Sequence, residues 1–191
     1  MTDVLAIAGS ARRRGNSDAV LEAALEVFKE RGASVRTIVP RKLTINPCFS
    51  CNGCWETGRC VVQDAMQDLY PLFLEADHVV AVSPIYFTSL PGHFKVMIDR
   101  FQCLWVRTYR LGRPPEPRRT GMFLAVGAMD RERYFRCTET IVKTWLSTLN
   151  MGCPVSRFYG GVDERGDIGA HPDYLEDARQ AAAELLDGAD R

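Results

Sequence analysis

VLAIAGSARRRGNS, residues 4–17, is a short apolar run followed by a polar loop. The run reaches Gly9 without a polar interruption, which is typical of a strand buried on both faces in a parallel sheet. A helix is predicted after the loop, with Ser17 as its N-cap and Gly32 as its C-terminal stop. Together these features predict the first unit of an α/β sheet.

The same alternation of strand and helix continues along the chain. Further strands are predicted at residues 34–39, 78–82, 122–126 and 155–159, and helices at residues 66–75, 92–105, 133–149 and 172–186. Residues 107–119, which contain three prolines, are predicted to form a loop. The pattern predicts an α/β protein with a flavodoxin-like open five-stranded parallel sheet of order 2-1-3-4-5 and helices on both faces. We expect residues 1–191 to form a single domain.

The composition narrows the classes of function. The chain has 191 residues, 24 basic and 24 acidic, so its net charge of zero gives no support for a nucleic-acid or membrane surface role. No apolar run is long enough for a transmembrane helix, and the N-terminal charges follow the apolar run, unlike in a signal peptide. We therefore expect a cytoplasmic protein. In a reducing compartment its seven cysteines indicate metal or redox chemistry.

The first loop has the residues of an anion site. Open α/β sheets bind ligands at the point where the order of the strands reverses. In the predicted order 2-1-3-4-5, this point lies between the first and third strands. The loop there offers Ser10, Arg12, Asn16 and Ser17 beside helix amides that favour an anion. It matches neither the dinucleotide nor the triphosphate motif, so a terminal monophosphate is predicted. The alternative is a capped helix preceded by solvated arginines.

The second loop at this edge, residues 83–92, offers a wall for a flat ring. Its aromatic side chains could cover the ring, and its hydroxyls and backbone could bind the polar edge. The alternative is that these aromatics pack on the end of the sheet. A ring-plus-phosphate ligand such as FMN is favoured by the two loops together. The residues assigned to the ring are Pro84, Ile85, Tyr86, Phe87, Gly127 and Ala128.

A cysteine-rich loop at residues 47–61 contains the spacing C-x2-C-x2-C-x5-C. Its thiols belong to Cys48, Cys51, Cys54 and Cys60. Four thiolates can hold a 4Fe–4S cluster, and the tight triplet is typical of such a site. Zinc is one alternative, although structural zinc usually joins two separated C-x2-C pairs. The other alternative is free thiols without metal.

The remaining cysteines, Trp55 and His93 are expected to have structural roles. Cys103, Cys137 and Cys153 are expected to be small buried hydrophobic residues. Trp55 is expected to anchor the cysteine loop. His93 lies near the presumed ring edge, and a structural role is favoured over a catalytic one.

The chain resembles the flavodoxin-like NAD(P)H-dependent FMN reductases. The resemblance is carried by GSARRRGNS (residues 9–17), by SPIYF (residues 83–87) with Lys95, Asp99 and Arg100 after it, and by the late GDI (residues 166–168). With the compact cysteines, the chain is similar to the iron–sulfur flavoprotein branch of that family. The resemblance implies FMN phosphate at the first loop, the isoalloxazine ring at the second, and a homodimer or homotetramer with the flavin near a subunit interface.

These observations predict an FMN-dependent oxidoreductase with a 4Fe–4S cluster. It would transfer electrons between FMN and a small donor or acceptor, such as ferredoxin, NAD(P)H, a quinone or an oxygen species. No catalytic side chain is predicted, because the cofactors supply the chemistry. One alternative is an NAD(P)H-dependent FMN or quinone reductase without a cluster. Another is a non-catalytic regulator that binds a nucleotide or zinc and uses residues 107–119 as a contact surface.

Overall fold

The computed structural model describes residues 2–115 and 119–189, and its centre is one sheet of five parallel strands. The strand order is β2-β1-β3-β4-β5, which confirms the predicted flavodoxin-like order. The strands are β1 (Asp3–Ala8), β2 (Ser34–Ile38), β3 (His78–Pro84), β4 (Arg119–Val126) and β5 (Met151–Tyr159).

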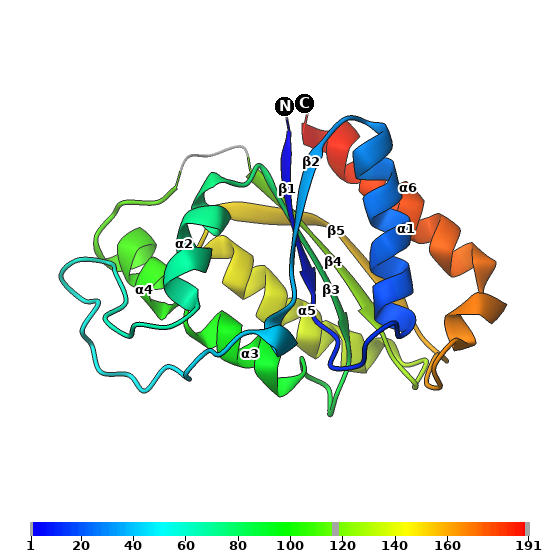
Figure 1. Cartoon of the computed structure of the whole chain (residues 1–191), viewed down its shortest axis with the longest axis horizontal. Coiled ribbons are helices and arrows are strands. Elements are labelled where there is room, and N and C mark those ends of the chain that lie inside the picture. Colours follow the sequence, from blue (N-terminus) through cyan, green and yellow to red (C-terminus); the bar gives the residue numbers. More distant parts are fainter. Residues whose placement is uncertain (1, 116–118, 190–191) are drawn as a thin grey trace.

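Helices cover both faces of the sheet (Figure 1). One face carries α1 and α6, and the other carries α2 to α5. The helices are α1 (Asn16–Glu30), α2 (Met66–Glu75), α3 (Gly92–Asp99), α4 (Gln102–Trp105), α5 (Glu132–Ser147) and α6 (Pro172–Ala189). None of the described helices is long and apolar enough to cross a membrane.

Alternate strand residues build the two cores. In β1, Leu5 and Ile7 pack toward α2 to α5, whereas Val4 and Ala6 pack toward α1 and α6. Successive side chains of a strand point to opposite faces, so an unbroken apolar run serves both cores. This confirms the double burial that the sequence predicts.

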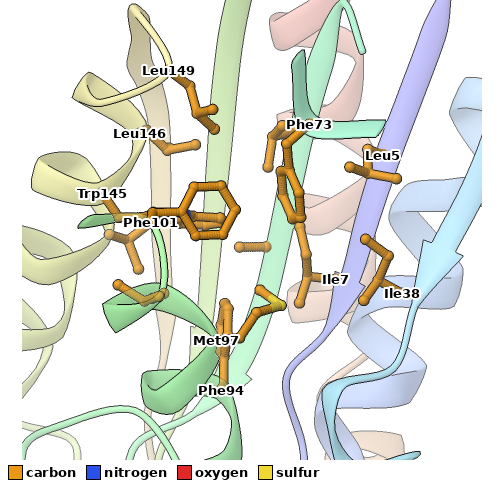
Figure 2. Packing of buried hydrophobic residues seen from close by; sticks show 14 of the residues in the cluster. Leu5, Ile7, Ile38, Phe73, Phe94, Met97, Phe101, Trp145, Leu146 and Leu149 are labelled. Carbon is orange, nitrogen blue, oxygen red and sulfur yellow. The ribbon is translucent and has the colours of Figure 1, made fainter. Parts of the chain in front are cut away.

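Aromatic side chains fill the core on the α2–α5 face (Figure 2). Phe101 lies edge-to-face against Phe73, with ring centroids 4.8 Å apart, and against Trp145 at 5.4 Å. Edge-to-face contacts of this kind are favourable beyond the area that they bury. They fix α2 and α5 to the short segment between α3 and α4.

The predicted helix at residues 92–105 is interrupted. α3 ends at Asp99 and α4 begins at Gln102. The amide of Phe101 donates to the carbonyl of Ile98, three residues back, so the helix tightens into a 3₁₀-like turn there. The interruption places Arg100 and Phe101 at a bend.

The loop predicted at residues 107–119 is only partly correct. Residues Val106–Arg110 continue from α4 as a π-helical turn, in which the Leu111 amide donates to the Val106 carbonyl. Arg119 already belongs to β4. Residues 116–118 of the predicted loop lie outside the described residues.

Gly9 lies at the closest approach of β1, β3 and α3. Its amide donates to the Val82 carbonyl at 2.8 Å. A Cβ at this position would lie 2.7 Å from Cδ1 of Phe94 and 2.8 Å from the Val82 oxygen. A side chain here would therefore overlap both the core and the backbone.

We predict that Gly9→Ala lowers the free energy of unfolding by about 1–3 kcal/mol, the usual cost of overpacking. Urea unfolding followed by circular dichroism measures this change. Gly152→Ala is the control, because a Cβ at Gly152 has no neighbour within 4 Å. Equal stabilities for the two variants would contradict the close approach at Gly9.

Candidate functional site

The loop at residues 9–15 leads from β1 directly into the first turn of α1. The Arg12 amide donates to the Ser10 hydroxyl at 3.1 Å, and both Ser10 and Ser17 are buried. Gly15, not Ser17, is the N-cap of α1, so the predicted cap is wrong and Ser17 lies inside the first turn. The first amides of a helix have no acceptor within it, and the helix dipole favours an anion there. This loop therefore has the geometry of an anion site.

A second segment, residues 163–168, is joined to this loop by hydrogen bonds. The side-chain amide of Asn16 donates to the Glu164 carbonyl at 2.7 Å, and its oxygen accepts from the Gly166 amide at 2.9 Å. The guanidinium of Arg12 donates to the Asp163 carbonyl at 2.9 Å. Asn16 thus has a structural role that the sequence did not reveal, and its contact with a phosphate stays a prediction.

The loop after β3 forms a tight turn. Tyr86 and Ser89 exchange two backbone hydrogen bonds, of 2.8 and 2.9 Å. Phe87 and Thr88, at the tip, have φ angles of 49° and 60°. Left-handed backbone is unfavourable for bulky and β-branched residues and concentrates at functional sites. The turn presents Phe87 fully to solvent, with a relative exposure of 103%.

The two loops line two adjoining cavities at the carboxyl edge of the sheet. The smaller cavity has a volume of about 120 Å³ and the larger about 340 Å³, and Ile85, Gly127 and Ala128 line both. All ten residues assigned to the ring-plus-phosphate ligand line one or both cavities: Ser10, Arg12, Asn16, Ser17, Pro84, Ile85, Tyr86, Phe87, Gly127 and Ala128.

The linings of the cavities suit different parts of one ligand. The smaller cavity combines hydroxyls, Arg12 and helix amides, which are the usual partners of a phosphate. Met129, Tyr134 and Phe158 add apolar walls to the larger cavity. Its volume lies within the range of small-molecule sites, and a flat aromatic ring fits walls of this kind. These residues fit a ring-plus-phosphate cofactor.

Arg41 and His93 form hydrogen bonds with the backbone of the first loop. Arg41 donates to the Ser10 carbonyl at 2.9 Å, and His93 Nε2 lies 3.1 Å from the Gly9 carbonyl. Arg41 was not among the predicted site residues, although its position just after β2 puts it at the same edge of the sheet. His93 bonds the loop backbone, which agrees with the structural role favoured for it.

The cysteine loop joins β2 to α2 without helix or strand between residues 43 and 63. Cys48, Cys51, Cys54 and Cys60 all line one cavity of about 430 Å³. Burial raises the pKa of the Cys54 thiol, and the nearby charges of the other three cysteines add to this effect. The four thiols are therefore close enough to influence one another.

The arrangement of these thiols bears on the kind of metal centre. Across residues 2–115 and 119–189, no three His, Cys, Asp or Glu side chains gather closely enough to hold a single metal ion. Four thiols that line one cavity are the donor type of a 4Fe–4S cluster. They do not form such a gathered group, so the cluster, the zinc site and the free thiols all stay predictions.

Contacts with the segment after α4 position the cysteine loop. The guanidinium carbon of Arg110 lies 4.5 Å from the centroid of the Trp55 ring. Gly58 has a φ of 68°, and a Cβ there would lie 2.8 Å from Cβ of Arg107. The π-helical turn and the loop thus fit closely, with Trp55 as the expected anchor.

The remaining cysteines differ in their surroundings. Cys103 is buried as predicted, but it also lines the cysteine cavity, and burial raises its pKa to about 11. Cys153 is only half-buried, and Cys137 is exposed on α5, so the prediction of burial is wrong for Cys137. The helical pattern around Cys137 did not reveal which face it occupies.

The sheet order, and the ligand-sized cavities at its switch point, define a protein of the flavodoxin-like class. The chain belongs to the NADPH-dependent FMN reductase family, whose model matches residues 2–159. This confirms the family that the loop motifs predict.

Individual relatives agree with this assignment. An iron–sulfur flavoprotein of Methanosarcina thermophila is 31% identical over 124 residues, which are 65% of this chain and 62% of that protein. One from Archaeoglobus fulgidus is 36% identical over 94 residues, which are 49% and 43% of the two chains. The match thus spans less than two thirds of the length of these relatives.

Solved structures share the fold. An NAD(P)H:quinone oxidoreductase from Methanothermobacter marburgensis superposes with a TM-score of 0.70 at 18% identity, covering 96% of this chain and 98% of that one. An FMN-dependent NADH-azoreductase from Bacillus anthracis in complex with FMN has a TM-score of 0.63 at 14% identity, with 97% and 99% covered.

The pKa of His93 gives a prediction for stability. Burial lowers this pKa, the bond with Gly9 opposes the effect, and the charge of Arg41 adds to the lowering. Between the folded value and the unfolded value of about 6.5, the unfolded chain binds more protons. Stability due to neutral His93 is thus complete above about pH 6.5 and falls as the pH drops toward the folded value.

We predict that His93→Gln reduces the loss of unfolding free energy between about pH 7.5 and pH 5.5. The reduction is at most about 1.4 kcal/mol, because only about one unit of this pH range lies below the unfolded pKa of about 6.5. Urea titrations of both proteins at the two pH values measure it. An identical pH dependence in wild type and variant would show that His93 is not buried in its neutral form.

Proposed function

We propose that this protein uses FMN and a 4Fe–4S cluster to transfer electrons between a small donor and a small acceptor. The observation that carries the proposal is that all four loop cysteines line one cavity beside α4, in a chain whose flavin cleft lies at the other end of α3. The names of the matched relatives support the cluster.

The chain's own residues bind and orient FMN. Arg12, the hydroxyls of Ser10 and Ser17 and the first amides of α1 hold the phosphate. The turn at residues 86–89 and the walls at Met129 and Phe158 hold the ring and exclude water from it. When bound, FMN supplies two-electron chemistry, and the cluster supplies one-electron chemistry.

NAD(P)H or a small ferredoxin is the proposed donor, and a quinone or an oxygen species the proposed acceptor. With NAD(P)H, the donor loses a hydride and the acceptor gains two electrons and two protons, one of them from solvent. We assign no side chain as general acid or base, because water can deliver that proton.

Exposed large apolar residues support contacts with partners or with a second copy of the chain. Phe87 and Met129 are exposed at the ring end of the cleft, and Phe49, Trp55 and Trp105 are exposed around the cysteine cavity. Exposed apolar side chains gathered at functional sites commonly mark contact surfaces. A homodimer or homotetramer is our proposal for the assembly, with residues 1–191 as one FMN-binding domain.

A cluster-free NAD(P)H-dependent FMN or quinone reductase is the second candidate. It is favoured by the fact that the flavin cleft contains no residue of the cysteine loop. The fold and the flavin chemistry would therefore persist without a cluster. Iron and sulfide content separates the two candidates.

We predict that Arg12→Ala and Ser17→Ala each lower the affinity for FMN about tenfold or more, because a charge-assisted hydrogen bond contributes about 1.5–3 kcal/mol. Fluorescence titrations of the flavin-free protein with FMN and with riboflavin measure this. Riboflavin lacks the phosphate, so its affinity should not change. Arg13→Ala, at an exposed loop position, is the control. A parallel loss of riboflavin affinity would contradict the phosphate assignment.

Serine substitution tests the cluster. We predict that Cys48→Ser, Cys51→Ser, Cys54→Ser or Cys60→Ser lowers the iron content of anaerobically reconstituted protein from about four per chain and leaves FMN binding intact. The control is Cys137→Ser, which changes an exposed cysteine on α5. Wild-type protein that stays yellow and free of iron after reconstitution would refute the cluster and favour the second candidate.

A further inference from the structure

Arg100 forms hydrogen bonds with residues at both ends of the cysteine loop. It lies just after α3, and its side chain is only 1% exposed. Nη1 donates to the Asn46 carbonyl at 2.8 Å and to Asp64 at 2.5 Å, and Nη2 lies 3.3 Å from Sγ of Cys60. One guanidinium thus binds residues on both sides of the loop and one of its cysteines.

Asp64 is the counter-charge of Arg100. Its side chain is buried and accepts from the amides of Asn46 and Met66 at 2.9 and 3.0 Å. Burial would raise the pKa of Asp64, but the hydrogen bonds from Arg100 and these amides outweigh burial and lower it. The carboxylate is therefore ionised, and Arg100 and Asp64 form a buried ion pair beside Cys60.

Two features place this charge beside the cysteines of the cavity. Arg100 itself lines the cavity, and its buried Nε has no hydrogen-bond partner among the described residues. Within residues 2–115 and 119–189, Cys60 is the one loop cysteine that receives a hydrogen bond from a charged side chain. Among the four loop cysteines, the positive charge of Arg100 therefore contacts Cys60.

We infer that Arg100 is a positioning residue that fixes Cys60 as a ligand and raises the reduction potential of the bound cluster. This inference rests on the proposed function. Reduction adds negative charge to a cluster, and hydrogen bonds and positive charge at its sulfurs stabilise the reduced state. The effect is enhanced by burial, because a charge is screened less away from water.

Arg100 also connects the cysteine cavity with the flavin cleft. α3 begins beside the first loop, where His93 contacts the Gly9 carbonyl, and it ends at Asp99, directly before Arg100. Its eight residues span about 12 Å at 1.5 Å per residue. The residue that bonds Cys60 is therefore held by the same short helix that borders the flavin site.

The test is a spectroelectrochemical titration of wild-type and variant holoprotein, combined with iron and FMN assays on each sample. Arg100→Gln should shift the cluster potential to a more negative value, by about tenfold in the reduction equilibrium or about 59 mV for one electron. Asp64→Asn should shift it in the opposite direction, because it removes the counter-charge and keeps the arginine. The flavin potential should stay constant in both.

Arg119→Gln is the matched control. Arg119 is also buried and donates to the carbonyls of Phe73 and Ala76, at the far end of α2 from the cysteine loop. It should leave the cluster potential unchanged. If Arg100→Gln binds too little iron, Arg100→Lys, which keeps the charge, should restore binding.

Unchanged cluster potentials in iron-loaded Arg100→Gln and Asp64→Asn would overturn the inference. Shifts of the same sign in both variants, or loss of iron from both Arg100→Gln and Arg100→Lys, would also overturn it and leave Arg100 a purely structural role. A wild-type protein that binds no cluster would instead show that the proposed function itself is wrong.

Discussion

The parallel pairing of β1 with β3 is the constraint on which both sites depend. It aligns Ala8 with Val82, so the loops that follow these two strands emerge side by side. Gly9 lets the first loop pass within bonding distance of β3 and in contact with Phe94. A side chain at Gly9 would overlap Phe94 of α3 and the Val82 carbonyl of β3. The two adjoining cavities at this edge of the sheet depend on this close approach.

α3 connects the cysteine cavity with the cleft at the carboxyl edge of the sheet. The loop after β3 leads into α3, whose start touches the first loop at Gly9 and whose end places Arg100 beneath the cysteines. The helix break directs the Arg100 guanidinium to Asn46, Asp64 and Cys60. Phe101, the next residue, fills the aromatic core with Phe73 and Trp145 and holds the bend in place. The cysteine loop is thus an addition to a flavin fold that is anchored in the core.

The sequence was sufficient for the fold and for the loops that line the two cavities. An unbroken apolar run such as residues 4–8 is typical of a strand buried on both faces in a parallel sheet, and open α/β sheets bind ligands at the ends of such strands. The break at Arg100 and the π-helical turn were not predictable, because apolar spacing continues through both. Cys103 and Arg41 belong to the two sites through contacts distant in sequence. The roles of Asn16 and Arg12 in binding residues 163–168 likewise depend on tertiary packing.

We have proposed that one chain holds a two-electron flavin and a one-electron cluster. An anaerobic titration with dithionite, followed by absorbance from the ultraviolet to the near infrared, measures how many electrons the chain takes up. We predict about three electrons per FMN-loaded, iron-reconstituted chain, two for the flavin and one for the cluster. A titration that ends at about two electrons, with only flavin absorbance bleached, would contradict it.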